Sequence, residues 1–195
     1  MSTLKSSYHH GDLRTALISA AVDILESGEP YSLRAVARRA GVSPTAPYRH
    51  FTDREALDSA VAVEGFKDLR EQLAQTLASH TNVTAAPEAL AELGVAYVNF
   101  ALRRPAVFRL MFGNECDQSD SARVQASQAL HTVLNEALER MLPAKASAEL
   151  ATALWGLAHG LAFLHLDGKY RPAPTEEVAA RVRDAVLAIL ALGQP

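Results

Sequence analysis

One spacing governs most of this sequence: apolar residues recur at intervals of three and four positions. Between Leu13 and Leu25 they fall at i, i+3, i+4 and i+7, which places them on one face of an α-helix. No segment shows the alternation of apolar and polar residues that is typical of half-buried strands. Hydrophobic residues make up 49% of the chain but aromatic residues only 6%, a composition that suits packed helices. The sequence therefore predicts an all-α protein.

Capping residues, glycines and prolines divide this pattern into about nine helices. Ser32 is an N-cap candidate for one of them, and Thr52 with Glu55 has the spacing of a capping box. The expected helices cover residues 13–27, 33–40, 44–51, 53–77, 87–104, 105–112, 122–142, 147–166 and 175–192. The helix after Thr52 is much longer than average, which is typical of a connector. We therefore expect an N-terminal three-helix domain at residues 1–52 and a helical domain at residues 53–195.

The N-terminal domain contains a tight reversal between two short helices. Gly41 ends the first of them, because glycine adopts a positive φ at low cost. Ser43 caps the second, and Pro44 occupies its first position, where an N–H has no helical partner. This arrangement is typical of a helix-turn-helix, whose second helix lies in the major groove of DNA.

Charge and cysteine content narrow the class of protein. Residues 1–51 carry six Lys and Arg against four Asp and Glu, whereas the remainder carries thirteen against eighteen. A basic segment on an acidic body suits nucleic-acid binding, although this imbalance is small. Cys116 is the only cysteine, so neither an intrachain disulfide nor a cysteine metal cluster is expected. The N-terminus lacks a signal-peptide core and no apolar run approaches the roughly 20 residues that span a bilayer, so we expect a cytoplasmic protein without a membrane partner.

The run from Ser32 to Leu57, SLRAVARRAGVSPTAPYRHFTDREAL, closely resembles the signature of the TetR family. Ala-Gly-Val-Ser at residues 40–43 precedes Tyr-x-x-Phe at 48–51, and Asp53-Arg54 leads into the next helix, as in that family. The resemblance implies a helix-turn-helix regulator with a C-terminal helical domain for ligand binding and dimerisation. It also implies contacts with DNA from Arg34, Ser43, Pro44, Thr45, Ala46, Tyr48, Arg49, His50 and Arg54. Pro47 departs from the family pattern, and we expect it to tighten or bend the second helix.

Two further features have alternative interpretations. The segment Tyr8–Arg14 resembles the lead-in of one TetR subgroup, which would place Lys5, His9 or His10 near phosphate; a frayed terminus with a helix cap is the alternative. We interpret Arg38 and Arg39 as solvated surface charges rather than phosphate contacts.

Two C-terminal segments resemble the TetR subgroup that has a Trp-His-Gly feature in its regulatory domain. They are residues 104–112 and the group formed by Trp155, His159 and Gly160. Aromatic walls with one or two polar groups are typical of a small-molecule site. The candidate ligand-pocket residues are Tyr97, Phe100, Phe108, Met111, Phe112, Trp155, His159 and Phe163. An ordinary hydrophobic core is the alternative interpretation for each of them.

A stripe of small residues in the same region indicates contact between two copies of the chain. Ala153, Gly156 and Gly160 are spaced three and four apart, so a second helix could approach them closely. We expect residues 147–192 to form a four-helix interface in a homodimer. The predicted interface residues are Ala153, Gly156, Gly160, Val182, Val186 and Ile189.

The sequence favours one function over its alternatives. It contains no Gly-rich phosphate loop, no nucleophile elbow and no metal-ligand cluster, so we expect neither an enzyme nor a cofactor or metal site. The favoured function is a repressor that a small-molecule effector releases from double-stranded operator DNA. An activator of the same fold and a helical protein-interaction module are the alternatives.

Overall fold

The computed structural model describes residues 10–80, 86–113 and 120–192, with only the backbone described at residues 10–12. Within these ranges the chain forms eight α-helices, one short 3₁₀-helix and no strand, so the all-α prediction is confirmed. The elements are α1 (His10–Ser27), α2 (Leu33–Arg39), η1 (Pro47–Arg49), α3 (Arg54–Ser79), α4 (Ala86–Arg103), α5 (Pro105–Gly113), α6 (Ser121–Met141), α7 (Ala148–Leu166) and α8 (Thr175–Ala191). Cys116 and the side chains of Lys5, His9 and His10 lie outside the described residues.

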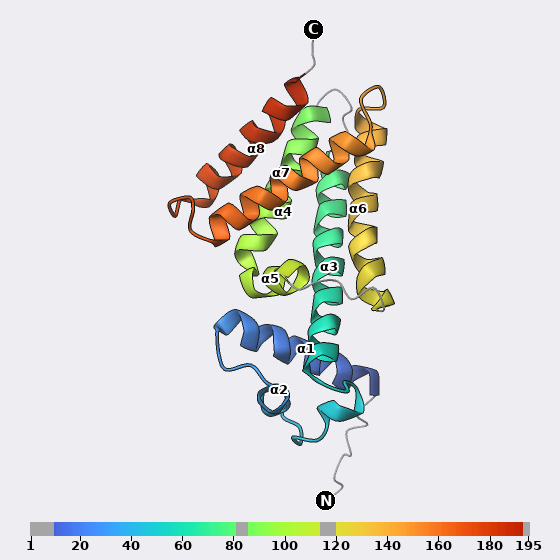
Figure 1. Cartoon of the computed structure of the whole chain (residues 1–195), viewed down its shortest axis with the longest axis vertical. Coiled ribbons are helices and arrows are strands. Elements are labelled where there is room, and N and C mark those ends of the chain that lie inside the picture. Colours follow the sequence, from blue (N-terminus) through green and yellow to red (C-terminus); the bar gives the residue numbers. More distant parts are fainter. Residues whose placement is uncertain (1–9, 81–85, 114–119, 193–195) are drawn as a thin grey trace, which may run out of the picture.

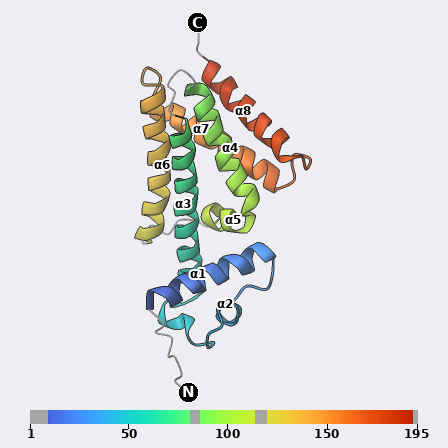
Figure 2. The ribbon, with the colours of Figure 1, turned by 180° about the vertical axis from the view of Figure 1, so that it is seen from behind.

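The helices form a small lobe and a larger body (Figure 1). The small lobe consists of α1, α2 and η1, and the first turns of α3 enter it from the body. In the body, α6 runs beside α3, and α4 packs against both α7 and α8. The view from behind shows the same order, with α5 lying between the small lobe and α4 (Figure 2).

The long helix α3 joins the two parts. Its 26 residues span about 39 Å at 1.5 Å per residue. The predicted start was wrong by one residue: Asp53, not Thr52, is the N-cap, because its carboxylate accepts the Ala56 N–H at 2.8 Å. The expected cap at Ser32 is confirmed, since its side chain accepts the Ala35 N–H, whereas no α-helix follows the expected cap at Ser43. Ser147 caps α7 by accepting the Leu150 N–H.

Helix α8 packs closely on α4 through a glycine. A Cβ atom at Gly94 would lie 3.1 Å from Val186 and 3.3 Å from Val182. Both valines are buried within a single copy of the chain. Their apolar surface is thus covered by α4 within one copy, and the place of Val182 and Val186 in a dimer interface stays a prediction.

Candidate nucleic-acid interface and internal cavity

The reversal after α2 has the geometry that a helix-turn-helix requires. Gly41 adopts φ +70°, in the left-handed region that favours glycine. The Val42 N–H donates to the Ala37 carbonyl at 3.0 Å, and the Gly41 N–H donates to Arg38 at 3.2 Å. These two bonds form a Schellman motif, which satisfies the last carbonyls of α2 and turns the chain outward.

The segment that follows is not the α-helix predicted for residues 44–51. The chain makes turns at residues 44–46 and then the single 3₁₀-helix η1, in which the His50 N–H donates to the Pro47 carbonyl at 2.9 Å. The cause is Pro47, which has no N–H to donate to the Ser43 carbonyl. The Ala46 N–H takes that carbonyl instead, at 2.9 Å, which tightens the first turn.

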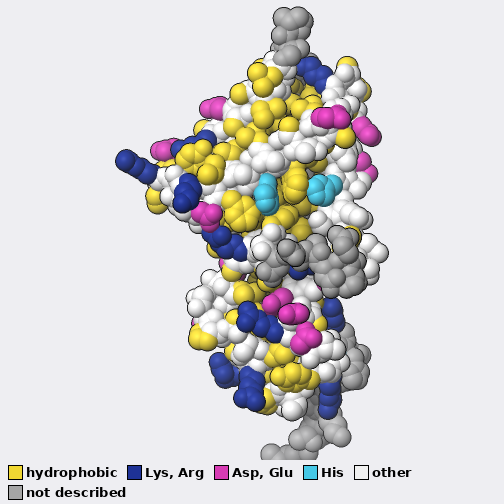
Figure 3. Space-filling model, viewed as in Figure 1, with side chains coloured by type: hydrophobic (Ala, Val, Ile, Leu, Met, Phe, Trp, Pro, Cys, Tyr) yellow, Lys and Arg dark blue, Asp and Glu magenta, His cyan; other side chains and the backbone are white. Residues whose placement is uncertain are grey.

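Although this segment does not form the expected α-helix, several of its side chains are exposed. Tyr48 is 54% exposed, and Thr45 beside it is also exposed. Pro47 is buried, and Arg side chains (dark blue) lie at several places on this end of the molecule (Figure 3). Of the predicted contact residues, the exposed ones are Arg34, Ser43, Pro44, Thr45, Tyr48, Arg49 and Arg54, and the half-buried ones are Ala46 and His50.

Arg54 is held at the start of α3 by two neighbours. Its guanidinium lies 4.8 Å from the centre of the Tyr31 ring, and its Nε lies 3.5 Å from an Asp58 carboxylate oxygen. The Tyr31 hydroxyl donates to the same carboxylate at 2.7 Å, and burial raises the pKa of this hydroxyl well above its ordinary value. The Arg54 side chain is nevertheless 61% exposed, so the site presents an oriented positive charge to solvent.

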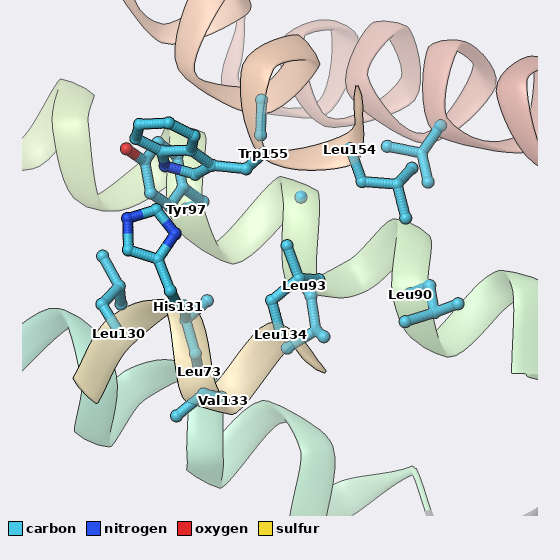
Figure 4. Close-up of a pocket in the computed structure, with 13 residues that line it drawn as sticks. Leu73, Leu90, Leu93, Tyr97, Leu130, His131, Val133, Leu134, Leu154 and Trp155 are labelled. Atoms are coloured by element: carbon cyan, nitrogen blue, oxygen red, sulfur yellow. The ribbon is translucent and has the colours of Figure 1, made fainter. Parts of the chain in front are cut away.

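The body contains a cavity of about 50 Å³ between α3, α4, α6, α7 and α8 (Figure 4). Its walls are mainly aliphatic, and its polar groups come from Tyr97, His131 and Trp155. Of the predicted pocket residues, only Tyr97 and Trp155 line it. His131 was missed, although its place between Leu130 and Leu134 on the inner face of α6 is a signal that the sequence contains.

The other predicted pocket residues pack together beside the cavity. Phe108 and Phe112 of α5 contact the His159 ring at centroid distances of 5.8 and 4.8 Å, and Phe163 lies 4.9 Å from it. Phe100 and Met111 are buried in the core and do not line the cavity. For these six residues, Phe100, Phe108, Met111, Phe112, His159 and Phe163, the core interpretation describes the structure better.

Burial sets the electrostatics of the cavity and of the cluster beside it. It lowers the pKa of both His131 and His159, so both imidazoles are neutral at pH 7. The Tyr97 hydroxyl lies 2.8 Å from His159 Nδ1, and burial raises its pKa. The Trp155 indole N–H is buried and has no hydrogen-bond partner.

One carboxylate bridges the small lobe and the body. Glu26 of α1 accepts the Val107 N–H at 3.0 Å and the Ala106 N–H at 3.2 Å. Helix α5 begins at Pro105, so Glu26 supplies from another helix the cap that α5 lacks in its own sequence. Arg104 also pairs with Asp68 of α3. The first turn of α5 is thus fixed to both α1 and α3.

The small-residue stripe of α7 faces outward. Ala153, Gly156 and Gly160 are exposed, and a Cβ at either glycine would meet nothing within 4 Å. Leu164, one turn further along, is 39% exposed, whereas Ile189 of α8 is half-buried. Hydrophobic side chains cover a broad part of this face of the body (Figure 3).

An exposed reading segment after a glycine turn, joined by one long helix to a helical body with an internal cavity, defines a helix-turn-helix regulator. The particular family follows from comparison with known proteins. Two family models match the chain. The model described as "Bacterial regulatory proteins, tetR family" matches residues 17–61, and the one described as "Tetracyclin repressor-like, C-terminal domain" matches residues 90–189. The chain belongs to the TetR family.

Individual relatives agree with this assignment. A Rhodococcus protein of unknown function has a similar structure, with a TM-score of 0.79, 32% identity, and coverage of 94% of this chain and 98% of that one. The regulator LfrR from Mycobacterium smegmatis, solved in complex with proflavine, shares the fold with a TM-score of 0.60, 17% identity, and coverage of 94% and 96% of the two chains. An uncharacterized HTH-type transcriptional regulator from Haemophilus influenzae is 29% identical over 129 residues, or 65% of this chain. The match spans 62% of that curated relative's length.

Two kinds of feature are absent from the described residues. No described helix is long and apolar enough to cross a membrane. In the same ranges, no group of three or more His, Cys, Asp or Glu side chains is placed to hold a metal ion.

Proposed function

We propose that this chain is a transcriptional repressor that binds operator DNA through residues 43–50, assisted by Arg34 and Arg54, and that a small molecule in the cavity releases it. The exposure of Tyr48 and Thr45 after the Gly41 turn is the observation that carries the proposal. Tyr48 and Arg49 supply phosphate contacts, and Thr45 lies where it can reach base edges. We assign DNA binding to residues 1–52, and effector binding and dimerisation to residues 53–195.

The active form is a homodimer. Two reading segments must lie about 34 Å apart to enter successive major grooves on one face of DNA, and a two-fold axis supplies the second segment. The outward stripe of Ala153, Gly156 and Gly160, continued by Leu164, supports a close helix contact between copies, and Ile189 lies at its border. Sedimentation at micromolar concentration should give a dimer, and a monomer would contradict this part of the proposal.

Release follows from the connections between the cavity and the small lobe. The cavity borders Tyr97, whose ring packs edge-on against Phe108 of α5 at 5.6 Å. Helix α5 is fixed to α1 through Glu26, and α3 continues into the lobe as a lever. A ligand that binds better to a body with α5 displaced shifts the population toward a misaligned pair of reading segments. LfrR, which binds proflavine, supports a small molecule as the class of effector.

A binding assay on the DNA upstream of the protein's own gene tests the proposal. Anisotropy of labelled duplex should show an affinity that falls steeply with salt, because contacts with phosphate release counterions. Tyr48→Ala should abolish specific binding without changing the helical signal in circular dichroism. Arg49→Ala should weaken binding and reduce the salt slope by about one, whereas Arg140→Ala on exposed α6 should change neither. A chain that ignores every duplex offered would overturn the proposal.

The alternatives make different predictions. An activator would raise the output of in vitro transcription from the bound promoter, whereas a repressor lowers it. A protein-interaction module would bind no DNA at any salt concentration.

We also infer that the chain is a cytoplasmic protein and not an enzyme. We further propose that it belongs to the Trp-His-Gly subgroup; Trp155 and His159, whose rings lie 5.4 Å apart on α7, support this part of the proposal.

A further inference from the structure

The composition of the cavity wall limits the charge of any ligand. Its 13 lining residues include no Asp, Glu, Lys or Arg, and Tyr97 and His131 are its titratable groups. His131 is neutral at pH 7, because burial lowers its pKa. An ionised carboxylate, phosphate or ammonium group would be buried here without a counter-charge, which is strongly unfavourable. The wall therefore favours an uncharged molecule.

The polar groups lie together at one end of the cavity. The indole of Trp155 and the rings of Tyr97 and His131 gather there, whereas Leu90, Leu93 and Leu154 line the other end (Figure 4). The ring centres of His131 and Trp155 are 4.6 Å apart. The ligand must accordingly have a polar end and an apolar end.

One donor at the polar end is unused. The Trp155 Nε1 atom is buried and makes no hydrogen bond of normal geometry; the Tyr97 hydroxyl lies near enough to interact with it but is already bonded to His159 at 2.8 Å. An indole N–H can donate but cannot accept. A buried unsatisfied donor is unfavourable, and an acceptor on a ligand would relieve that cost. The chemistry of this end thus selects a hydrogen-bond acceptor.

The size of the cavity sets the third constraint. At about 50 Å³ it is far smaller than the roughly 300–1,000 Å³ of sites for drug-sized ligands. A ligand of a few heavy atoms enters with little rearrangement, and a longer one displaces aliphatic side chains at the apolar end.

We propose that this cavity takes a small, uncharged, mainly aliphatic molecule with a carbonyl or ether oxygen that accepts a hydrogen bond from the Trp155 indole. This assignment of the ligand class rests on the proposed effector function of the body. It makes Trp155 the residue that distinguishes oxygenated ligands from plain hydrocarbons, and the uncharged wall the feature that excludes organic ions.

Trp155 is the only tryptophan in the chain, so its fluorescence reports on the cavity alone. The probes are 2-heptanone, hexanoate and hexylammonium, which have similar apolar length but differ in charge. The ketone should change the emission saturably, and the two ions should bind at least about tenfold more weakly at equal ionic strength. Equal affinity for either ion, or no saturable binding of the ketone, would overturn the ligand class.

A second experiment isolates the N–H group. Because the chain has one tryptophan, growth with the benzothiophene analogue replaces only residue 155 and exchanges the N–H for sulfur at nearly constant shape. Calorimetric affinity for 2-heptanone should fall by about three- to tenfold, as expected for one hydrogen bond. Trp155→Phe should give at least the same loss, and Glu136→Ala, on the exposed face of α6, should give none. Unchanged ketone affinity in the analogue would refute the role of the indole.

The same probes separate failure of the ligand class from failure of the proposed function. Measured with the labelled duplex present, ketone binding that weakens DNA affinity supports both. Ketone binding without any effect on DNA supports the ligand class and contradicts the effector function. Release by an ion instead of the ketone supports the effector function and refutes the ligand class.

Discussion

Glu26 gives the sharpest test of how the two parts of the molecule are joined. Its carboxylate accepts two N–H groups at the start of α5, at 3.0 and 3.2 Å, and it is the cap of a helix that lies far away in sequence. We predict that Glu26→Ala lowers global stability and loosens the contact between α1 and α5. Glu26→Gln keeps one acceptor oxygen but loses the charge, so it should have a smaller effect.

The magnitude follows from the two contacts. Loss of a helix cap costs about 1 kcal/mol, and loss of a negative charge beside a helix N-terminus costs about 0.3–1 kcal/mol. Glu26→Ala should therefore cost about 1–2 kcal/mol, and Glu26→Gln about half of that. For a chain of 195 residues, 1 kcal/mol corresponds to roughly 2–4 °C in Tm. The expected fall is about 2–8 °C for the alanine variant.

Thermal unfolding followed by circular dichroism measures this effect, with Glu136→Ala on the exposed face of α6 as the matched control. The control should change Tm by less than about 2 °C, because exposed substitutions cost little. The alanine variant should also need more effector to release a given fraction of labelled DNA, since displacement of α5 no longer pulls on α1. A Tm equal to that of the control, with normal release, would refute the assignment of Glu26 as a bridge.

Three further predictions concern packing, the turn and pH. Gly65→Ala should lower stability by about 1–3 kcal/mol in urea unfolding, because its Cβ would lie 2.6 Å from buried Met111; Gly113→Ala, whose Cβ would meet nothing within 4 Å, is the control and should change stability little. Gly41→Ala should cost about 1–2 kcal/mol and reduce DNA affinity, because φ +70° strains any residue with a Cβ; retained stability and affinity would contradict this reading of the turn. Acidification from pH 7.5 to 5.5 should destabilise the fold, because burial lowers the folded-state pKa of His131 and His159 and the unfolded chain then binds more protons. A free energy of unfolding that rises on acidification would refute this predicted direction.

The sequence predicts helices well where a local cause acts alone. Ser32 caps the helix that it was expected to cap, because a cap needs only the following turn. At α3 two neighbouring candidates compete, and Asp53 takes the position because its carboxylate reaches the Ala56 N–H while Thr52 donates to Asp53. Residues 44–51 depend on two prolines in one turn. Their spacing predicted a distortion, but not that the α-helix would be replaced by η1.

The cavity illustrates a stronger limit. Aromatic residues on α4, α5 and α7 were expected to enclose a ligand, yet they fill one another's space around His159. The empty volume lies instead against α6, where leucines and His131 leave a gap beside Trp155. Periodicity shows which face of a helix is buried, but a void depends on side-chain volumes summed over five helices. That sum cannot be obtained from spacing along one chain.

Helix α8 shows why partners within and between copies of a chain are hard to separate. The four-residue spacing of Val182 and Val186 is the same whether they pack on a neighbouring helix or on a second copy. Gly94, which lets α8 pack closely on α4, lies far away in the sequence. With both valines packed inside one copy, the apolar surface that α8 leaves open comes from other residues: Ala180 and Ala188 are exposed, and Leu187 and Ile189 are half-buried. We propose that the closest approach between copies lies on α7, whose glycines admit a helix at short distance. An interface centred on Gly156 and Gly160 should accordingly fail when either becomes a bulky residue, although each substitution leaves the single chain intact.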